Sequence, residues 1–457
     1  MKTLDLTEGS IFQKLIRFSL PMIAGNLLQQ AYNLADTLIV GRYIGSDALA
    51  SVGSVYTLMI FITSIIIGLC MGSGAFFSED YGRKDEQQLK EDIVHSFGFI
   101  LSVTVVIYLI VYPGMEWIQK LLRTPEELME MTGEYVSAVF VGMIFIFLYN
   151  FFSYLLRAMG NPVVPLLFLA ISSVLNILLD LWFVIGLDAG VSGAAWATVI
   201  AQAVSGVGIT VYSLMKLPIL RLHYGNIKWN RRRMKEIIIN DAATGMQQSV
   251  MNFGILMIQG LVNRFGTVVM ASFAAAVKID TIAYMPAQEF GNAYSLFVSQ
   301  NYGAKKSDRI EIGTRLAFRL SAAFCAVISV LIFLFAETLM RFFVDPSEIQ
   351  IIAEGVRYLR IEGSMYVGIG ILFLWYGYYR GICKPHISFI LTVISLGTRV
   401  ILSYTFAPHT VLGVAAIWLS IPIGWMIADT VGYVLYQKRK TAKTPDSNLP
   451  KTETHLT

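Results

Sequence analysis

The amino-acid sequence predicts an all-α membrane protein, with twelve transmembrane helices arranged in two six-helix pseudo-symmetric lobes. Three observations lead to this fold class: the composition, the length of the apolar runs and an internal repeat. Of the 457 residues, 55% are hydrophobic and 14% are charged, whereas about 25% of residues are charged in an ordinary soluble domain. The apolar residues gather in runs of about twenty or more, which is long enough to cross a bilayer.

These runs define the expected spans in chain order. They cover residues 15–40, 48–77, 93–113, 134–158, 163–187, 193–215, 237–262, 268–298, 314–336, 354–380, 386–407 and 413–437. Two of them, 48–77 and 268–298, are long enough to tilt or bend in the membrane.

The basic residues orient the chain. With the amino terminus in the cytoplasm, the segments on that side carry 26 of the 35 lysines and arginines, and the opposite connections carry 7. Because positive loops stay inside, we expect a multi-pass protein of the cell membrane with both termini cytoplasmic. The run Arg231–Arg233 is interpreted as a topology anchor, with recognition of acidic lipid as the alternative. The polar tail, 438–457, is expected to be disordered.

The composition argues against several other classes of protein. A formal charge of +4 is too small to indicate a nucleic-acid partner. The cysteines at 70, 325 and 383 are far apart and lie in apolar runs, so neither a disulfide framework nor a metal site is expected. No nucleophile stands with a base and no histidines have zinc spacing, so an enzyme, a cofactor or a resident metal is not expected. We expect a monomer.

An internal repeat divides the chain. Tyr81-Gly82 matches Tyr302-Gly303 at a shift of 221, and Arg157…Pro162 matches Arg380…Pro385 at a shift of 223. Each half holds six spans, so both halves enter the membrane in the same direction. They should be related by an axis along the membrane normal, with a substrate site between them. The predicted parts are an amino-terminal lobe (1–215), a basic cytoplasmic linker (216–236), a carboxyl-terminal lobe (237–437) and the tail (438–457).

The first half contains acids inside the membrane without a matching base. Asp36 lies on one face of its span with Asn26, Gln29 and Asn33, at steps of three and four residues. Asp180 follows Asn176 by four residues, so they share a face of span 5. Two unbalanced acids in one cavity must be protonated or bind a cation such as sodium. The candidate cation-coupling residues are Asp36, Asn176, Asp180 and Thr198. The alternative is a pair of neutral carboxyls that hydrogen-bond between helices.

Other polar residues suggest a hinge, a cavity and a charge network. Pro21 in span 1 is either a hinge or a first-turn proline. Glu289 is a candidate to meet a cationic substrate, with a structural role as the alternative. The candidate residues of the substrate cavity are Gln29, Asn33, Gln248, Asn252 and Glu289. The candidate charge network, in which the side chains neutralise one another, consists of Lys278, Asp280 and Arg399.

The sequence resembles the multidrug and toxic compound extrusion (MATE) family, in the multidrug/oligosaccharidyl-lipid/polysaccharide flippase superfamily. The resemblance covers nearly the whole chain. The motifs that carry it are Pro21…Gln29-Gln30…Asp36…Gly41, the Tyr-Gly-basic turns at 81–84 and 302–305, Arg157…Asn161-Pro162, Asn176…Asp180 and Gly190…Gly193-Ala194-Ala195.

The resemblance implies two lobes in a V, alternating access, and export of organic cations driven by inward proton or sodium flow. In members with an amino-terminal site, residues matching Asp36, Asn176, Asp180 and Thr198 surround the coupling ion, and Pro21 matches a bend. Glu289 resembles a glutamate on span 8 of related exporters. Some relatives have a second site on spans 7 and 10, but span 7 here has no central acid and Glu362 lies near the outer end of span 10.

The expected function is therefore secondary active antiport of organic cations or other amphipathic compounds against protons or sodium. The alternative is a flippase or exporter of a specific metabolite or lipid-linked substrate, which would be expected to line its cavity with several cations.

Overall fold

The computed structural model describes residues 3–44, 46–121, 126–221 and 229–443, and these form helices without a strand. The first half contains α1 (Ile11–Ile39), α2 (Ser46–Arg83), α3 (Glu86–Val111), α4 (Met115–Leu121), α5 (Glu126–Ala158), α6 (Val163–Asp180) and α7 (Gly190–Lys216). The second half contains α8 (Arg231–Val262), α9 (Thr267–Gly303), α10 (Ser307–Phe343), α11 (Ile349–Gly363), α12 (Tyr366–Gly381), α13 (Pro385–Phe406) and α14 (Val414–Lys443).

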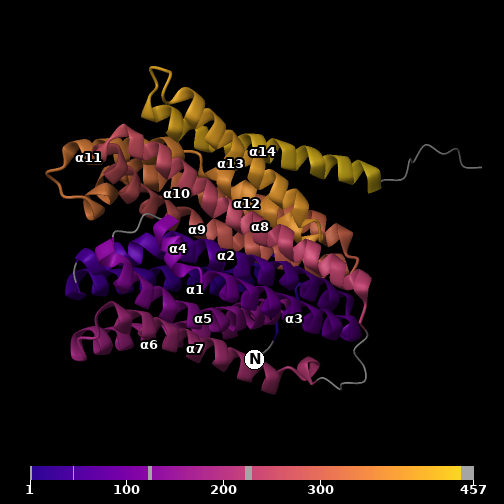
Figure 1. Ribbon diagram of the computed structural model, residues 1–457. Helices are drawn as coiled ribbons and strands as arrows, with labels where there is room; N and C mark the ends of the chain where they lie inside the picture. The colour runs from indigo at the N-terminus through magenta and orange to yellow at the C-terminus, as the bar shows by residue number, and fades with distance from the viewer. Residues whose placement is uncertain (1–2, 45, 122–125, 222–228, 444–457) are drawn as a thin grey trace, which may run out of the picture.

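The two halves lie side by side. In Figure 1, α1 to α7 gather in the lower part of the view and α8 to α14 in the upper part. The long helices correspond one to one with the predicted spans, except that α11 and α12 together make the tenth. The twelve-span, two-lobe fold class is confirmed. We call the side at which α2 ends and α8 begins the inner side, which the distribution of basic residues predicts to be cytoplasmic.

Hydropathy alone would miss part of this architecture. By length and apolar composition, nine helices of the described chain could cross a membrane. The other long ones are α1 and α8, which have polar faces, and the pair α11 and α12, with 15 and 16 residues. The predicted tenth span, 354–380, is therefore broken between Gly363 and Tyr366, where one continuous helix was expected. The predicted linker and tail lie partly outside the described residues, and α8 already begins at Arg231.

Helix α1 packs with both halves of the chain. Leu15, Phe18 and Met22 belong to a core formed mostly by the second half. Ile39, near the other end, packs with residues of the first half. Pro21 lies inside the helix, ten residues after its start, so it is not a first-turn proline. A proline in a helix interior removes a backbone hydrogen bond and favours bending. Pro21 therefore favours a bend close to the point where α1 passes from one packing environment to the other.

The repeated Tyr-Gly turns meet at the inner side. A Cβ on Gly82 at the end of α2 would overlap the backbone carbonyl of Gln300 on α9, and a Cβ on Gly303 would overlap that of Glu79 on α2. The internal repeat relates the two contacts to each other: Gly82 corresponds to Gly303, and Glu79 corresponds to Gln300, both at a shift of 221. The pseudo-two-fold axis therefore runs between α2 and α9, and only glycine allows the helices to cross so closely.

An amino-terminal segment, residues 4–9, joins the lobes beside this crossing. The backbone N–H of Leu4 donates to the carbonyl of Gly160, in the turn after α5, over 2.9 Å. Leu6 is fully buried, and its N–H donates to Oε1 of Gln300 over 3.0 Å. Arg309 of α10 donates to the carbonyl of Leu6 over 3.2 Å. The inner side is therefore closed by contacts between the lobes.

Candidate functional site

The four predicted coupling residues gather between α1, α6 and α7. The side chain of Asp180 is fully buried and that of Asn176 is 2% exposed. Nδ2 of Asn176 donates to Oγ1 of Thr198 over 3.3 Å. Asp36 on α1, which packs against α6, is close enough to interact electrostatically with Asp180. The four residues that the sequence analysis selected from three separate spans therefore lie in one region of the structure.

This region has unsatisfied oxygen atoms. Oδ1 of Asp36, Oδ1 of Asn176 and both carboxyl oxygens of Asp180 are buried without a hydrogen-bond partner. Buried polar groups normally have partners. Among the described residues, no lysine or arginine forms an ion pair with either acid. Such oxygens suit a proton or a hard monovalent cation, which prefers oxygen ligands.

Both acids lie next to wide helical turns. A π-helical segment, Val40–Ile44, follows α1 four residues after Asp36, and another, Leu181–Gly186, begins directly after Asp180. The two segments contact each other. Such π segments occur frequently at functional sites because they disturb the regular backbone bonding.

Glu289 connects the lobes. Its side chain is 8% exposed, and its Oε1 accepts from Nδ2 of Asn26 on α1 over 2.9 Å and from Nδ2 of Asn292 over 3.1 Å. Oδ1 of Asn292 in turn accepts from Arg380 on α12 over 2.8 Å. Arg380 is 4% exposed and also donates to Ser295 over 3.1 Å. The sequence pattern identified Arg380 only as a repeat position, and its match to Arg157 was the available signal.

The remaining cavity candidates stay partly accessible. Gln29 is exposed, and Asn33, Gln248 and Asn252 are half-buried. Asn33 donates to Gln30 on its own helix over 3.3 Å. The structure therefore leaves these amides open on α1 and α8, while Glu289 is engaged between the lobes.

The charge network differs from the one predicted. Asp280 is buried and accepts hydrogen bonds from Tyr366 over 2.6 Å and Tyr358 over 3.4 Å. Asp280, Arg399 and Glu362 line one cavity of about 80 Å³. Lys278 is exposed and does not line it. Two residues correspond to about 200° around a helix, so Lys278 faces away from Asp280, and Glu362 is the third charged residue.

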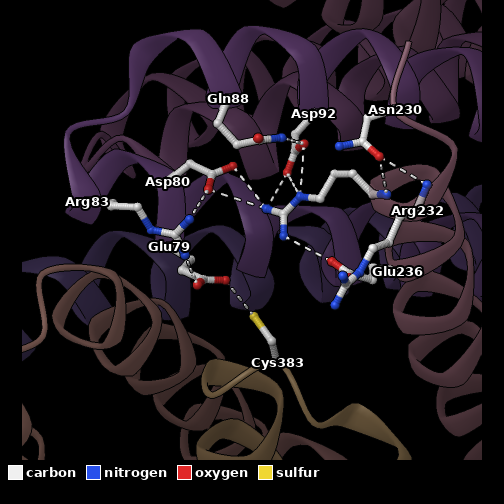
Figure 2. A network of polar contacts seen from close by, with 10 residues as sticks. Glu79, Asp80, Arg83, Gln88, Asp92, Asn230, Arg232, Glu236 and Cys383 are labelled. Atoms are coloured by element: carbon white, nitrogen blue, oxygen red, sulfur yellow. Dashed lines mark hydrogen bonds and ion pairs between the residues drawn. The ribbon is translucent and has the colours of Figure 1, made fainter. Parts of the chain in front are cut away.

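A second polar network closes the inner side (Figure 2). Arg233 at the start of α8 donates to Asp92 on α3 through Nε and Nη2, over 2.9 and 2.6 Å, and reaches Asp80 on α2 over 3.3 Å. The Sγ of Cys383 donates to Oε2 of Glu79 over 3.1 Å. The Arg233 side chain is 13% exposed and both aspartates are fully buried. For Arg233, the alternative of recognising acidic lipid is therefore wrong, since the first turn of α8 directs its side chain against α2 and α3; the role of the basic run as a topology anchor stays a prediction.

We expect the Arg233→Ala variant to unfold at a markedly lower temperature in detergent. The change leaves Asp80 and Asp92 buried without their base, and breaking a buried ion pair in this way costs about 3–5 kcal/mol. Arg232→Ala is the matched control, because that side chain is 91% exposed and such changes usually stay within about 0.5 kcal/mol. Equal melting temperatures for the two variants would show that the network contributes little.

Twelve spans in two pseudo-symmetric lobes, with unpaired acids inside the membrane, define a membrane transporter of the two-lobe kind. The MatE family model matches residues 21–182 and 243–405, once in each half. The chain belongs to the MatE family, whose members are membrane transporters and not enzymes.

Relatives match the chain over nearly its whole length. It is 28% identical to the probable multidrug resistance protein YpnP of Bacillus subtilis, covering 96% of this chain and 97% of that protein. It is 26% identical to the probable multidrug resistance protein NorM of Thermotoga maritima, covering 92% and 90%. A crystal structure of MATE in complex with MaL6 superposes with a TM-score of 0.91 at 25% identity, covering 97% and 99% of the two chains. An outward-facing multidrug resistance MATE family transporter of the MOP superfamily gives 0.90 at 25% identity, with the same coverage.

Proposed function

We propose that this protein is a secondary active multidrug efflux antiporter. It exports organic cations or other amphipathic compounds across the cell membrane in exchange for protons or sodium. The observation that carries the proposal is the set of unpartnered oxygens on Asp36, Asn176 and Asp180. The names of the YpnP and NorM relatives support the multidrug part.

The two lobes must communicate for exchange to occur. Helix α1 carries Asp36 near its outer end, Pro21 in its inner half and Asn26 between them. Asn26 binds Glu289 of the other lobe. When a cation neutralises Asp36, a change in the bend of α1 at Pro21 shifts Asn26 and so alters how Glu289 is held. Uptake of the ion and the affinity of the drug site are linked through one helix.

The available gradients are large enough for this work. One elementary charge moving down 100 mV supplies about 2.3 kcal/mol, and one pH unit adds about 1.36 kcal/mol. One ion therefore supports roughly a hundredfold or greater accumulation of a neutral solute. A monovalent cation expelled for one proton is exchanged electroneutrally, so only the pH gradient drives it.

Reconstitution tests the function directly. Purified protein in lipid vesicles should move ethidium when a proton gradient or a sodium gradient is imposed separately, and only the coupling ion should drive it. No movement under either gradient, with correctly inserted protein, would reject antiport of this cationic substrate.

Glu289→Gln should reduce transport of cationic dyes strongly and transport of neutral amphipathic dyes less. Glutamine keeps an oxygen that accepts from Asn26 and Asn292 but removes the negative charge. Initial efflux rates for a cationic and a neutral dye, at equal protein abundance, measure this difference. Glu337→Gln serves as the control because Glu337 is exposed and, within the described part of the chain, its ion pair is with Arg341 of its own helix. Equal losses for both dyes would assign Glu289 a structural role.

A further inference from the structure

A buried acid at the lobe interface has no role in the site described above. Asp241 lies on α8, two turns after Arg233, and its side chain is fully buried against α2. α2 belongs to the first half and α8 to the second, so Asp241 lies where the two halves meet on the inner side. The sequence analysis did not identify Asp241 as a candidate residue, because it lies near the start of the predicted span 237–262.

Its polar surroundings are incomplete. Oδ2 of Asp241 accepts from Oγ of Ser73 on α2 over 2.5 Å, and Oδ1 has no hydrogen-bond partner. Nδ2 of the neighbouring Asn240 donates to the carbonyl of Gly72 over 3.0 Å. A Cβ on Gly72 would come within 2.6 Å of Oδ1 of Asp241. The carboxyl is therefore enclosed by the backbone of the opposite lobe.

The ionisable groups around Asp241 do not neutralise it. Cys70 on α2 and Asp92 on α3 interact with it electrostatically, and both are acidic groups. Arg233, on its own helix, already binds Asp92 and Asp80. Within the described chain no basic side chain forms an ion pair with Asp241. An isolated buried carboxylate costs several kcal/mol, so this position suits a neutral, protonated carboxyl.

We propose that Asp241 and Ser73 form a proton-binding site that is loaded from the cytoplasm when the inner side closes. Closing the inner side removes the carboxyl from water, and a proton from the cytoplasm binds to its free oxygen. Opening the inner side separates α2 from α8, hydrates the carboxylate and returns the proton to the cytoplasm. The site carries no net charge across the membrane.

The consequence is a dependence of the conformational equilibrium on cytoplasmic pH. Because the closed state binds one more proton than the open state, the ratio of closed to open protein rises as the pH falls, by up to about tenfold per pH unit. The inference rests on the proposed function only in that the protein has one state with the inner side open and one with it closed. It concerns the populations of these two states in the absence of drug. Efflux assays test antiport separately.

Spin labels can test this proposal in the full-length protein in lipid. Labels replace Glu86 on α3 and Lys438 on α14, which are exposed at the inner ends of different lobes, after replacement of the three natural cysteines. Asp36→Asn and Asp180→Asn in the background remove the other candidate coupling acids. We expect the short-distance population to grow as pH falls, and Asp241→Asn to remove this response and hold the protein closed.

The controls separate the proposal from its competitors. Asp308→Asn, at an exposed acid on the same side, should keep the full response. If Asp241→Asn fails to fold, Ser73→Ala should still move the pH midpoint, because it removes the hydrogen bond that Ser73 donates to Asp241. A full response in Asp241→Asn, an unmoved midpoint in Ser73→Ala, or a response to replacing sodium by potassium at fixed pH would overturn the proposal.

Discussion

Asp36→Asn will reduce drug efflux to the level of cells that lack the protein. Asparagine has nearly the same shape as aspartate, so the packing of α1 should persist, but it neither takes up a proton at neutral pH nor attracts a cation. Asp180 would then be left without its negatively charged neighbour. Accumulation of ethidium in growing cells, together with growth at toxic concentrations, measures the effect.

Abundance in the membrane must be measured in the same cells, because a misfolded protein would give the same loss of efflux. Asp188→Asn is the matched control, since Asp188 is an exposed acid in the turn before α7, and its efflux should be normal. Unchanged efflux for Asp36→Asn at normal abundance would remove Asp36 from the coupling site.

Gly82→Ala and Gly303→Ala should each prevent full closure of the inner side and abolish most efflux. In both variants the new methyl group would overlap a backbone carbonyl of the other lobe, and a backbone cannot rotate away as a side chain can. The helices must separate, so the inner ends should move apart. The same spin-label pair on α3 and α14 would report a longer distance, and dye efflux would report the loss.

Gly98→Ala provides a clear comparison. A Cβ on Gly98 would meet nothing within 4 Å, and alanine in a helix is favoured over glycine by roughly 0.5–1 kcal/mol. Helix propensity alone would therefore make all three variants slightly more stable. Only the two at the crossing should lose efflux, and normal efflux in Gly82→Ala would show that the crossing opens at little cost.

The fold was largely predictable because membrane spans leave strong local signals. Apolar runs located the helices, and the matching Tyr-Gly turns gave the symmetry that the Gly82–Gln300 and Gly303–Glu79 contacts display. The gathering of Asn176 and Thr198 was also accessible, because a polar face inside a membrane must turn towards other helices. The functional roles of Asp36 and Asp180 stay predictions.

The sequence pattern could not predict features that depend on tertiary contacts. Arg233 belongs to a basic run that looks like any cytoplasmic loop, and only its contact with Asp80 and Asp92 shows that it is buried. The break after Gly363 has no proline beside it that would have marked it in the sequence. Lys278 and Asp280 are close in sequence but point in different directions, so summing their charges placed them together wrongly.

The polar character of α1 has a consequence for the biogenesis of the protein. Among the described helices α1 is translated first, yet its polar face of Asn26, Gln29, Asn33 and Asp36 opposes its insertion into lipid as a single span. The helices that it packs against, α6 and α9, are synthesised much later. A lone α1 therefore lacks the neighbours that make it stable in lipid, and the order of assembly in the membrane differs from the order of translation.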